Sequence, residues 1–235
     1  MKIGFICALD VEVEGIKQLM ADKTEQTVAK ITYAQGEIFG QQVVCCECGM
    51  GKVNAAMSAQ IMIDLYRPDV IINSGIAGSL SKDIRIGDLV VADDCVQHDM
   101  DVTEMGDPLG QIQFNDEVRI YLPADTATAD RLEKACQLPD DTLVFRGRIA
   151  SGDVFISSRD HRQAIADIFD ALACEMEGAA VGQVCYRNAV PFTILRCISD
   201  DFNENEYMDY MKFRSVAAEK AISVITEFIR SFTTE

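Results

Sequence analysis

The sequence contains few of the side chains on which most metal and nucleic-acid sites depend. It has two histidines, His98 and His161, and no tryptophan. It has 21 Lys and Arg against 38 Asp and Glu, which gives a net charge of −17. Zinc sites take well-spaced Cys and His ligands, and nucleic-acid binding depends on clustered positive charge. We therefore expect no metal, no nucleic-acid partner and no attraction to an anionic membrane surface.

Long apolar runs are missing as well. No stretch approaches the ~20 apolar residues that a membrane-spanning helix needs. The first residues, MKIGFICALDVEVEGI, pass from a short apolar run to acidic residues, which predicts a core strand rather than a signal peptide. Nine cysteines without a regular spacing are typical of reduced thiols, so we expect a cytoplasmic protein.

Three of these cysteines, Cys45, Cys46 and Cys48, lie close together in the segment VCCEC. A zinc site would need further Cys or His ligands at a suitable spacing. Free cysteine is more often a small buried side chain. We interpret the segment as part of a buried strand.

Apolar strand-like runs alternate with helical patterns along the 235 residues of the chain. The expected strands are 2–9, 41–49, 69–75, 87–93, 142–152 and 191–199, and the expected helices are 10–21, 52–66, 126–136, 159–169, 177–188 and 210–232. Continuous apolar strands between helices indicate an α/β fold with a central sheet. No linker or repeat divides the sequence, so we expect one domain over residues 1–235. The polar segment 99–125 predicts a long loop, which in a compact domain is usually functional or flexible.

Three acidic residues, Glu12, Glu177 and Asp200, follow or end expected strands, where open α/β sheets bind ligands. Glu177 also heads an apolar helical face, so its carboxylate should be buried. Glu175, two residues earlier, would not share that face. Each acid alone could belong to a helix first turn or a cap. Several acids at corresponding strand ends are better explained by a shared site.

A site rich in acids suits a reaction with a cationic transition state. Cleavage of a glycosidic bond is such a reaction, because an oxocarbenium ion forms while one acid protonates the leaving group and a carboxylate activates water. Phe155 could be an ordinary core residue or could stack on a nucleobase. The segment SGIAGS, 74–79, could be a tight strand-to-helix turn or could bring backbone N–H groups close to a sugar or an anion. GMGKVN matches neither the dinucleotide-binding nor the P-loop pattern.

Motifs across nearly the whole chain resemble the 5′-methylthioadenosine/S-adenosylhomocysteine nucleosidases, a family of the purine-nucleoside-phosphorylase and uridine-phosphorylase superfamily. The matching segments, in family order, are MKIGFICALDVEVE, GMGKVNAA, RPDVIINSGIAGSL, IGDLVVADD, QHDMDVTEMGDPLG, IASGDVFI, CEMEGAAVGQVC, VPFTILRCISD and FRSVAA. EMEGAA followed by RCISD is highly specific. The resemblance implies a three-layer α/β/α fold with a central mixed, twisted sheet. It also implies a homodimer whose interface the 98–110 segment crosses, and catalysis without a cofactor or a metal.

The resemblance also implies roles for individual residues. Glu12 would activate the attacking water, and Glu177 would hold the ribose hydroxyls and face the developing cation. Asp200 would serve adenine N7 by proton donation or hydrogen bonding. Further residues would bind substrate or orient groups: Phe155 stacking on the base, the backbone of Ile156 reading its Watson–Crick edge, Met176 against the sugar, Arg196 orienting carboxylates and water, Tyr210 closing over the 5′-substituent, and Met50, Ile76 and Ser199.

The chain departs from the family pattern at two places. Ile76 stands where many members have Ser or Thr, and Leu9 and Val11 replace the more usual Met and Glu. An aliphatic residue at position 76 resembles the branch that also processes 6-amino-6-deoxyfutalosine. These differences concern substrate preference more than reaction type.

The nucleophile distinguishes a hydrolase from a phosphorylase of the same fold. A phosphorylase holds phosphate, usually with arginines, and related phosphorylases carry them just before the SGIAGS segment and after the first strand. This chain has Asn73 and the acidic LDVEVEG there, so water is the expected nucleophile.

We therefore expect hydrolysis of 5′-modified adenosines to adenine and the ribose derivative. The candidate substrates are 5′-methylthioadenosine, S-adenosylhomocysteine, 5′-deoxyadenosine and 6-amino-6-deoxyfutalosine. The alternatives are a phosphate-dependent nucleoside phosphorylase and a non-catalytic adenosine-binding homologue. The pathway stays open between methionine salvage, quorum-signal supply and menaquinone synthesis.

Overall fold

The computed structural model describes residues 1–137, 141–200, 202 and 206–233, without the side chains of 206–212. Its strands are β1 (Lys2–Cys7), β2 (Ala21–Val28), β3 (Ile31–Ile38), β4 (Gln41–Glu47), β5 (Val70–Ser79), β6 (Leu89–Gln97), β7 (Ile112–Gln113), β8 (Val118–Arg119), β9 (Leu122–Pro123), β10 (Val144–Ser151), β11 (Ala171–Glu175) and β12 (Phe192–Asp200). Its α-helices are α1 (Asp10–Leu19), α2 (Lys52–Tyr66), α3 (Thr126–Ala135), α4 (Arg159–Phe169), α5 (Gly178–Arg187) and α6 (Glu206–Arg230). Two short 3₁₀ helices are η1 (Thr103–Met105) and η2 (Ser231–Thr233).

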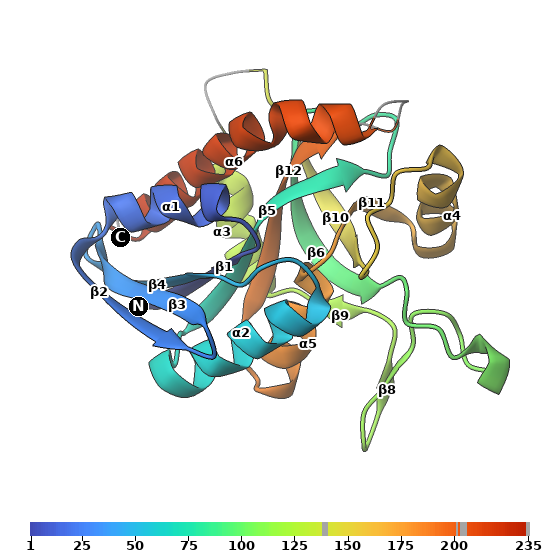
Figure 1. The fold of residues 1–235 in the computed structure, drawn as a ribbon, viewed down its shortest axis with the longest axis horizontal. Coiled ribbons are helices and arrows are strands. Elements are labelled where there is room, and N and C mark those ends of the chain that lie inside the picture. The colour runs from blue at the N-terminus through green and yellow to red at the C-terminus, as the bar shows by residue number, and fades with distance from the viewer. Residues whose placement is uncertain (138–140, 201, 203–205, 234–235) are drawn as a thin grey trace.

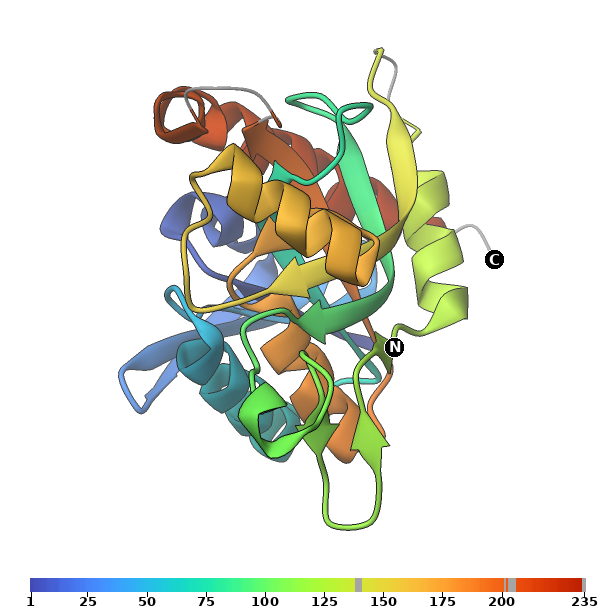
Figure 2. The same cartoon turned by 90° about the vertical axis from the view of Figure 1, so that its right-hand side faces the viewer.

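A mixed ten-stranded sheet lies between two layers of helices (Figure 1). The neighbour order is β11-β10-β6-β12-β5-β1-β4-β3-β2, with β9 beside β6. Helices α1, α3 and α6 cover one face, α2 and α5 cover the other, and α4 packs beside β10 and β11. Figure 2 shows the same layers from the side of α4. The expected α/β/α fold with a central mixed sheet is confirmed.

Alternating side chains give the sheet two apolar faces. In β1, Ile3 and Phe5 join the core under α1, α3 and α6, whereas Ile6 joins the core under α2 and α5. Cys45 and Cys46 alternate in the same way in β4. All nine cysteines are buried and none forms a disulfide, and Cys45 and Cys46 lie in β4, so the buried-strand interpretation of VCCEC is confirmed.

The sheet closes on itself at β11, next to the acidic residues that are expected to form the site. Strand β11 pairs with β10 and also, in the antiparallel direction, with the end of β5, where Cys174 lies opposite Gly78. Strands β1 and β12 run parallel to β5. The strand before Glu177 therefore runs opposite to the strand that ends in Asp200. Glu12 and Asp200 lie at the carboxyl ends of parallel strands, as the sequence suggested, whereas Glu177 follows a strand of opposite direction and joins them because β11 closes the sheet against β5.

Several element boundaries differ from the sequence-based expectation. Strand β5 continues through Ser79, so SGIAGS is strand and the turn interpretation is wrong. Strand β2 is absent from the expected strands. Its side chains are nearly all exposed, so its sequence lacks the apolar pattern of a strand with a buried face. Strand β11 is only five residues long. The segment 99–125 is mainly irregular, with only short elements in it. One domain over residues 1–235 stays a prediction.

Candidate active site

One pocket lies where β1, β5, β11 and β12 approach each other. It encloses about 620 Å³, part of it open to solvent, which lies in the range of small-molecule sites. Its walls include Ala8, Leu9, Glu12, Met50, Ile76, Ala77, Gly78, Val154, Phe155, Ile156, Arg162, Cys174, Glu175, Met176, Glu177, Ser199 and Asp200. Residues far apart in the sequence, from the first turn of α1 to the end of β12, thus share one cavity.

Glu12 is fixed in this pocket by three backbone donors. Its Oε2 accepts hydrogen bonds of 2.9 Å from the N–H groups of Ala8 and Leu9. Its Oε1 accepts one of 3.1 Å from the N–H of Ile76. Burial raises the pKa of Glu12, while Arg196 and these backbone hydrogen bonds oppose the rise. The absence of a side chain at Gly75 leaves room for the Glu12 carboxylate, because a Cβ at position 75 would lie 2.7 Å from Oε1 of Glu12.

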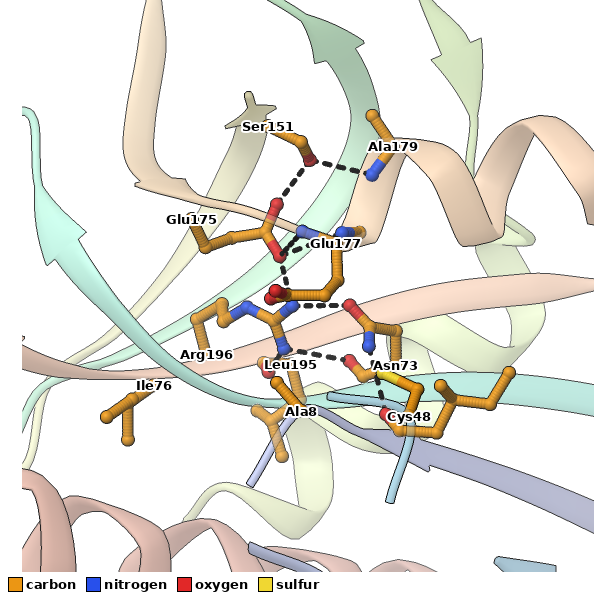
Figure 3. Close-up of polar contacts among 12 residues, drawn as sticks. Ala8, Cys48, Asn73, Ile76, Ser151, Glu175, Glu177, Ala179, Leu195 and Arg196 are labelled. Carbon is orange, nitrogen blue, oxygen red and sulfur yellow. Dashed lines mark hydrogen bonds and ion pairs between the residues drawn. The ribbon is translucent and has the colours of Figure 1, made fainter. Parts of the chain in front are cut away.

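Arg196 lies behind the pocket wall, between Glu175 and Asn73 (Figure 3). Its guanidinium forms an ion pair with Glu175 and donates to the side-chain oxygen of Asn73, whose amide donates to the carbonyl of Ile6 at 2.9 Å. Arg196 is 1% exposed. It contacts Glu175, a wall residue of the pocket, rather than the cavity itself.

Glu175 is the most fully hydrogen-bonded acid of the site. It accepts from the Ser151 hydroxyl and from the backbone N–H groups of Glu177 at 3.0 Å and Gly178 at 2.8 Å. Burial favours the protonated form, but Arg196 and the hydrogen bonds outweigh it and lower the pKa of Glu175. Glu175 is therefore a structural anion that neutralises Arg196.

Glu177 is the N-cap residue of α5, so its side chain enters the pocket just before the helix begins. Its Oε1 accepts a 2.8 Å hydrogen bond from the N–H of Gly51. Burial, followed by the negative charge of Glu175, raises the pKa of Glu177 to about 7, although Arg196 opposes the rise. The charged form of Glu177 is thus less stable than that of an exposed glutamate, and a bound cation would favour it.

Asp200 ends β12 on the opposite side of the pocket. Its Oδ1 accepts a 2.7 Å hydrogen bond from the Ser199 hydroxyl, and its Oδ2 forms an ion pair with Arg162. Arg162 also donates to the carbonyl of Ile156 at 3.1 Å and to that of Ser79 at 3.0 Å. Arg162 therefore joins the end of β12 to α4 and to the connection between β10 and α4.

Comparisons with known proteins agree with this geometry. The sequence profile of the phosphorylase superfamily matches residues 2–230. The 5′-methylthioadenosine/S-adenosylhomocysteine nucleosidase of Haemophilus influenzae (strain PittEE) is 38% identical over 230 residues, which cover 97% of this chain and 99% of that protein. The chain belongs to this nucleosidase family of the phosphorylase superfamily.

Solved structures extend the likeness to the fold. The nucleosidase of Neisseria meningitidis, in complex with methylthio-immucillin-A, has a TM-score of 0.92 at 29% identity and covers 98% of this chain and 99% of that chain. A futalosine hydrolase mutant of Helicobacter pylori strain 26695 has a TM-score of 0.91 at 29% identity, with 98% and 99% covered. The nucleosidase family thus has the same sheet and helix arrangement.

The structure brings most of the residues that the nucleosidase resemblance implied into this one pocket. The wall includes Glu12, Met50, Ile76, Phe155, Ile156, Met176, Glu177, Ser199 and Asp200. Arg196 lies behind it, and the side chain of Tyr210 lies outside the described part of the chain. Phe155 is 44% exposed, so the interpretation as a core residue is wrong.

Sequence reasoning missed the partners of the acids. Arg162 was not singled out, and neither the hydrogen bond between Ser151 and Glu175 nor the ion pair between Arg196 and Glu175 was expected. One signal for Arg162 was present: it shares the apolar face of α4 with Ile165 and Phe169, where a charged residue needs a buried partner.

Neither a metal site nor a membrane helix emerges from the part of the chain that the structure describes. Within those residues, no group of three His, Cys, Asp or Glu side chains could hold a metal ion. No helix among them is long and apolar enough to cross a membrane.

Proposed function

We propose that this protein hydrolyses the N-glycosidic bond of 5′-modified adenosines to adenine and the ribose derivative. The observation that supports this most directly is the convergence of three buried carboxylates, Glu12, Glu177 and Asp200, on one pocket. Cleavage of the bond leaves a ribosyl group with oxocarbenium character. Fixed negative charges around the sugar stabilise that cation more in the transition state than in the substrate.

Glu12 is proposed as the base that activates water. The C1′–N9 bond breaks, the C1′–O bond forms, and one proton of the water passes to Glu12. The three backbone donors hold the carboxylate in place, and its raised pKa makes it a better base than an exposed glutamate.

Glu177 and Asp200 are proposed to act on the two halves of the nucleoside. Glu177 would accept hydrogen bonds from the ribose hydroxyls and face the cation. Asp200 would share a proton with adenine N7 as the base leaves, and Ser199 and Arg162 hold it in position for that task. Phe155 borders the same pocket and is proposed to stack on the base.

The charges of the pocket favour water over phosphate as the nucleophile. Arg162 is the one basic residue among the described residues of the pocket wall, and it is ion-paired with Asp200. The guanidinium of Arg196 is neutralised by Glu175. Phosphate dianions are usually held by arginines that pair with their oxygens, whereas here the negative Glu12 lies in the pocket.

The assembly is proposed to be a homodimer. Val53 is 77% exposed and Met57 is 37% exposed, one helical turn apart on α2, and Met50 and Met105 are also exposed. Helix α2 and η1 both lie on the lower side of the molecule in Figures 1 and 2. Exposed apolar side chains on one side favour a partner surface, and a second copy of the chain would cover them. A cytoplasmic location and a place in methionine salvage stay predictions, the former supported by nine cysteines of which none forms a disulfide.

Adenine release tests the proposed activity. The purified protein is incubated in phosphate-free buffer with 5′-methylthioadenosine, S-adenosylhomocysteine, 6-amino-6-deoxyfutalosine, 5′-deoxyadenosine or adenosine, and the reactions are repeated with phosphate. We expect release without phosphate and no increase when it is added. Release that requires phosphate would establish the phosphorylase instead, and binding without turnover would establish the non-catalytic homologue. The Glu12→Gln variant controls for a contaminating nucleosidase.

A further inference from the structure

Three charged residues outside the catalytic set form a closed ring of contacts. Lys52, the first residue of α2, places its Nζ 2.6 Å from Oδ1 of Asp99, which follows β6. The backbone N–H of Lys52 donates to Oδ1 of Asp153 at 2.7 Å. The backbone N–H of Asp153, in the connection between β10 and α4, donates to Oδ2 of Asp99 at 2.8 Å. Three segments far apart in the sequence are thus joined.

The ring lies directly next to two parts of the pocket. Gly51 precedes Lys52 and donates to Glu177 at 2.8 Å. Its φ of +98° belongs to the region that favours glycine, and a Cβ would lie 3.1 Å from Oδ1 of Asp153. On the other side, Asp153 is followed by Val154, Phe155 and Ile156, all of which border the pocket.

A further contact connects the ring to α5. Nζ of Lys52 also donates to Oε1 of Gln97 at 3.0 Å, and the amide of Gln97 donates to Gln183. Gln183 belongs to α5, the helix that Glu177 caps. The ring therefore contacts both the residue that supplies a donor to Glu177 and the helix that carries Glu177.

We propose that Lys52, Asp99 and Asp153 form a clamp that positions the Gly51 N–H against Glu177 and the Phe155 segment against the base. This inference rests on the roles proposed above for Glu177 and Phe155. The clamp residues are positioning residues, since they act through Gly51 and the 154–156 segment. The ion pair is a stable fixing point because its side chains are mostly shielded, at 17% and 22% exposure, which strengthens the attraction over that of an exposed pair.

The clamp is tested with Lys52→Met, which keeps the aliphatic stem, and Asp99→Asn, which keeps the shape. Asp94→Asn is the matched control, because the Arg148–Asp94 pair has 20% and 22% exposure and lies outside the pocket wall. We expect kcat/KM for 5′-methylthioadenosine to fall about tenfold or more in both clamp variants, since small displacements of positioning groups are costly. Asp94→Asn should stay within about twofold of the wild type at a similar change in Tm.

Two further readouts separate positioning from stability. Lys52→Arg should recover most of the lost kcat/KM, and the double variant Lys52→Met/Asp99→Asn should lose little more than either single variant. The proposed clamp is contradicted if the clamp variants lose no more kcat/KM than Asp94→Asn does. It is also contradicted if the loss of kcat/KM in each variant is proportional to its decrease in Tm. The proposed role of Glu177 would be contradicted by a different result, namely full turnover by the Glu177→Gln variant.

Discussion

Arg162 forms an ion pair with Asp200, and the two side chains are 1% and 3% exposed. The same guanidinium donates to the carbonyl of Ile156, the residue proposed to read the edge of the base. Arg162 thus connects the proposed acid to the proposed base-recognition segment, although it lies on the packed face of α4. A buried pair of this kind fixes geometry, because loss of either partner leaves an uncompensated charge.

Replacing Arg162 should therefore affect both stability and catalysis. We expect Arg162→Met to lower the free energy of unfolding by about 3–5 kcal/mol, the usual cost of an unpaired buried charge. kcat/KM should fall more than in Arg162→Lys, which keeps the positive charge. Thermal unfolding and adenine release measure the two effects. Equal kcat/KM in the two variants would show that the charge of Arg162 does not serve the reaction.

The proposed role of Asp200 is separable from substrate binding. Asp200→Asn keeps the shape and the neighbouring Ser199 but removes the proton-sharing carboxylate. We expect kcat to fall by about 10²–10⁴, the usual contribution of a general acid, while the Kd for 5′-methylthioadenosine changes little. Single-turnover kinetics and calorimetry measure these quantities. A near-normal kcat would exclude Asp200 as the acid.

The pH dependence should report on Glu177. Its pKa is raised to about 7, and the form that faces a cation is the carboxylate, so kcat/KM should fall as the pH drops through about 7. The negative charge of Glu175 contributes to that rise, so Glu175→Gln should move the acid limb to lower pH. An unchanged limb in Glu175→Gln would assign the titration to another group.

The raised pKa of Glu177 should also make the free energy of unfolding depend on pH. Folded Glu177 holds its proton more tightly than the unfolded residue does, so its contribution to stability is greatest below the unfolded pKa. That contribution is lost as the pH rises towards about 7. The Glu177→Gln variant should therefore gain stability relative to the wild type as the pH rises through this window, which urea unfolding at several pH values measures.

The space left by Gly75 is predicted to be essential for Glu12. In Gly75→Ala, the new Cβ would lie 2.7 Å from Oε1 of Glu12, so the carboxylate must move. We expect kcat to fall about tenfold or more. Gly40→Ala is the control, because position 40 has a φ of +76° but no atom within 4 Å of a Cβ, so it should cost about 1 kcal/mol of stability at unchanged kcat. Normal turnover by Gly75→Ala would show that Glu12 tolerates displacement.

The sequence by itself determined the parts of this protein that depend on local patterns. Helix α2 has the expected bounds, and the strands that contribute to the site were predicted to within a few residues, except β11, because periodicity and strand-end acids are properties of short segments. The motifs that carry the nucleosidase resemblance are also local. The strand-end positions and these motifs both predict Glu12, Glu177 and Asp200 as site residues.

Only the tertiary structure decided which groups neutralise these acids and how they meet. Arg162 forms an ion pair with Asp200, and Arg196 forms one with Glu175. The partners are too far apart in the sequence for a local pattern to predict the pairing. Glu177 joins Glu12 and Asp200 because β11 closes the sheet against the end of β5, a pairing of residues remote in the chain. The charge of a buried carboxylate is set by its three-dimensional neighbours and by desolvation. The chemistry of the pocket therefore depends on contacts that form only when the whole sheet is assembled.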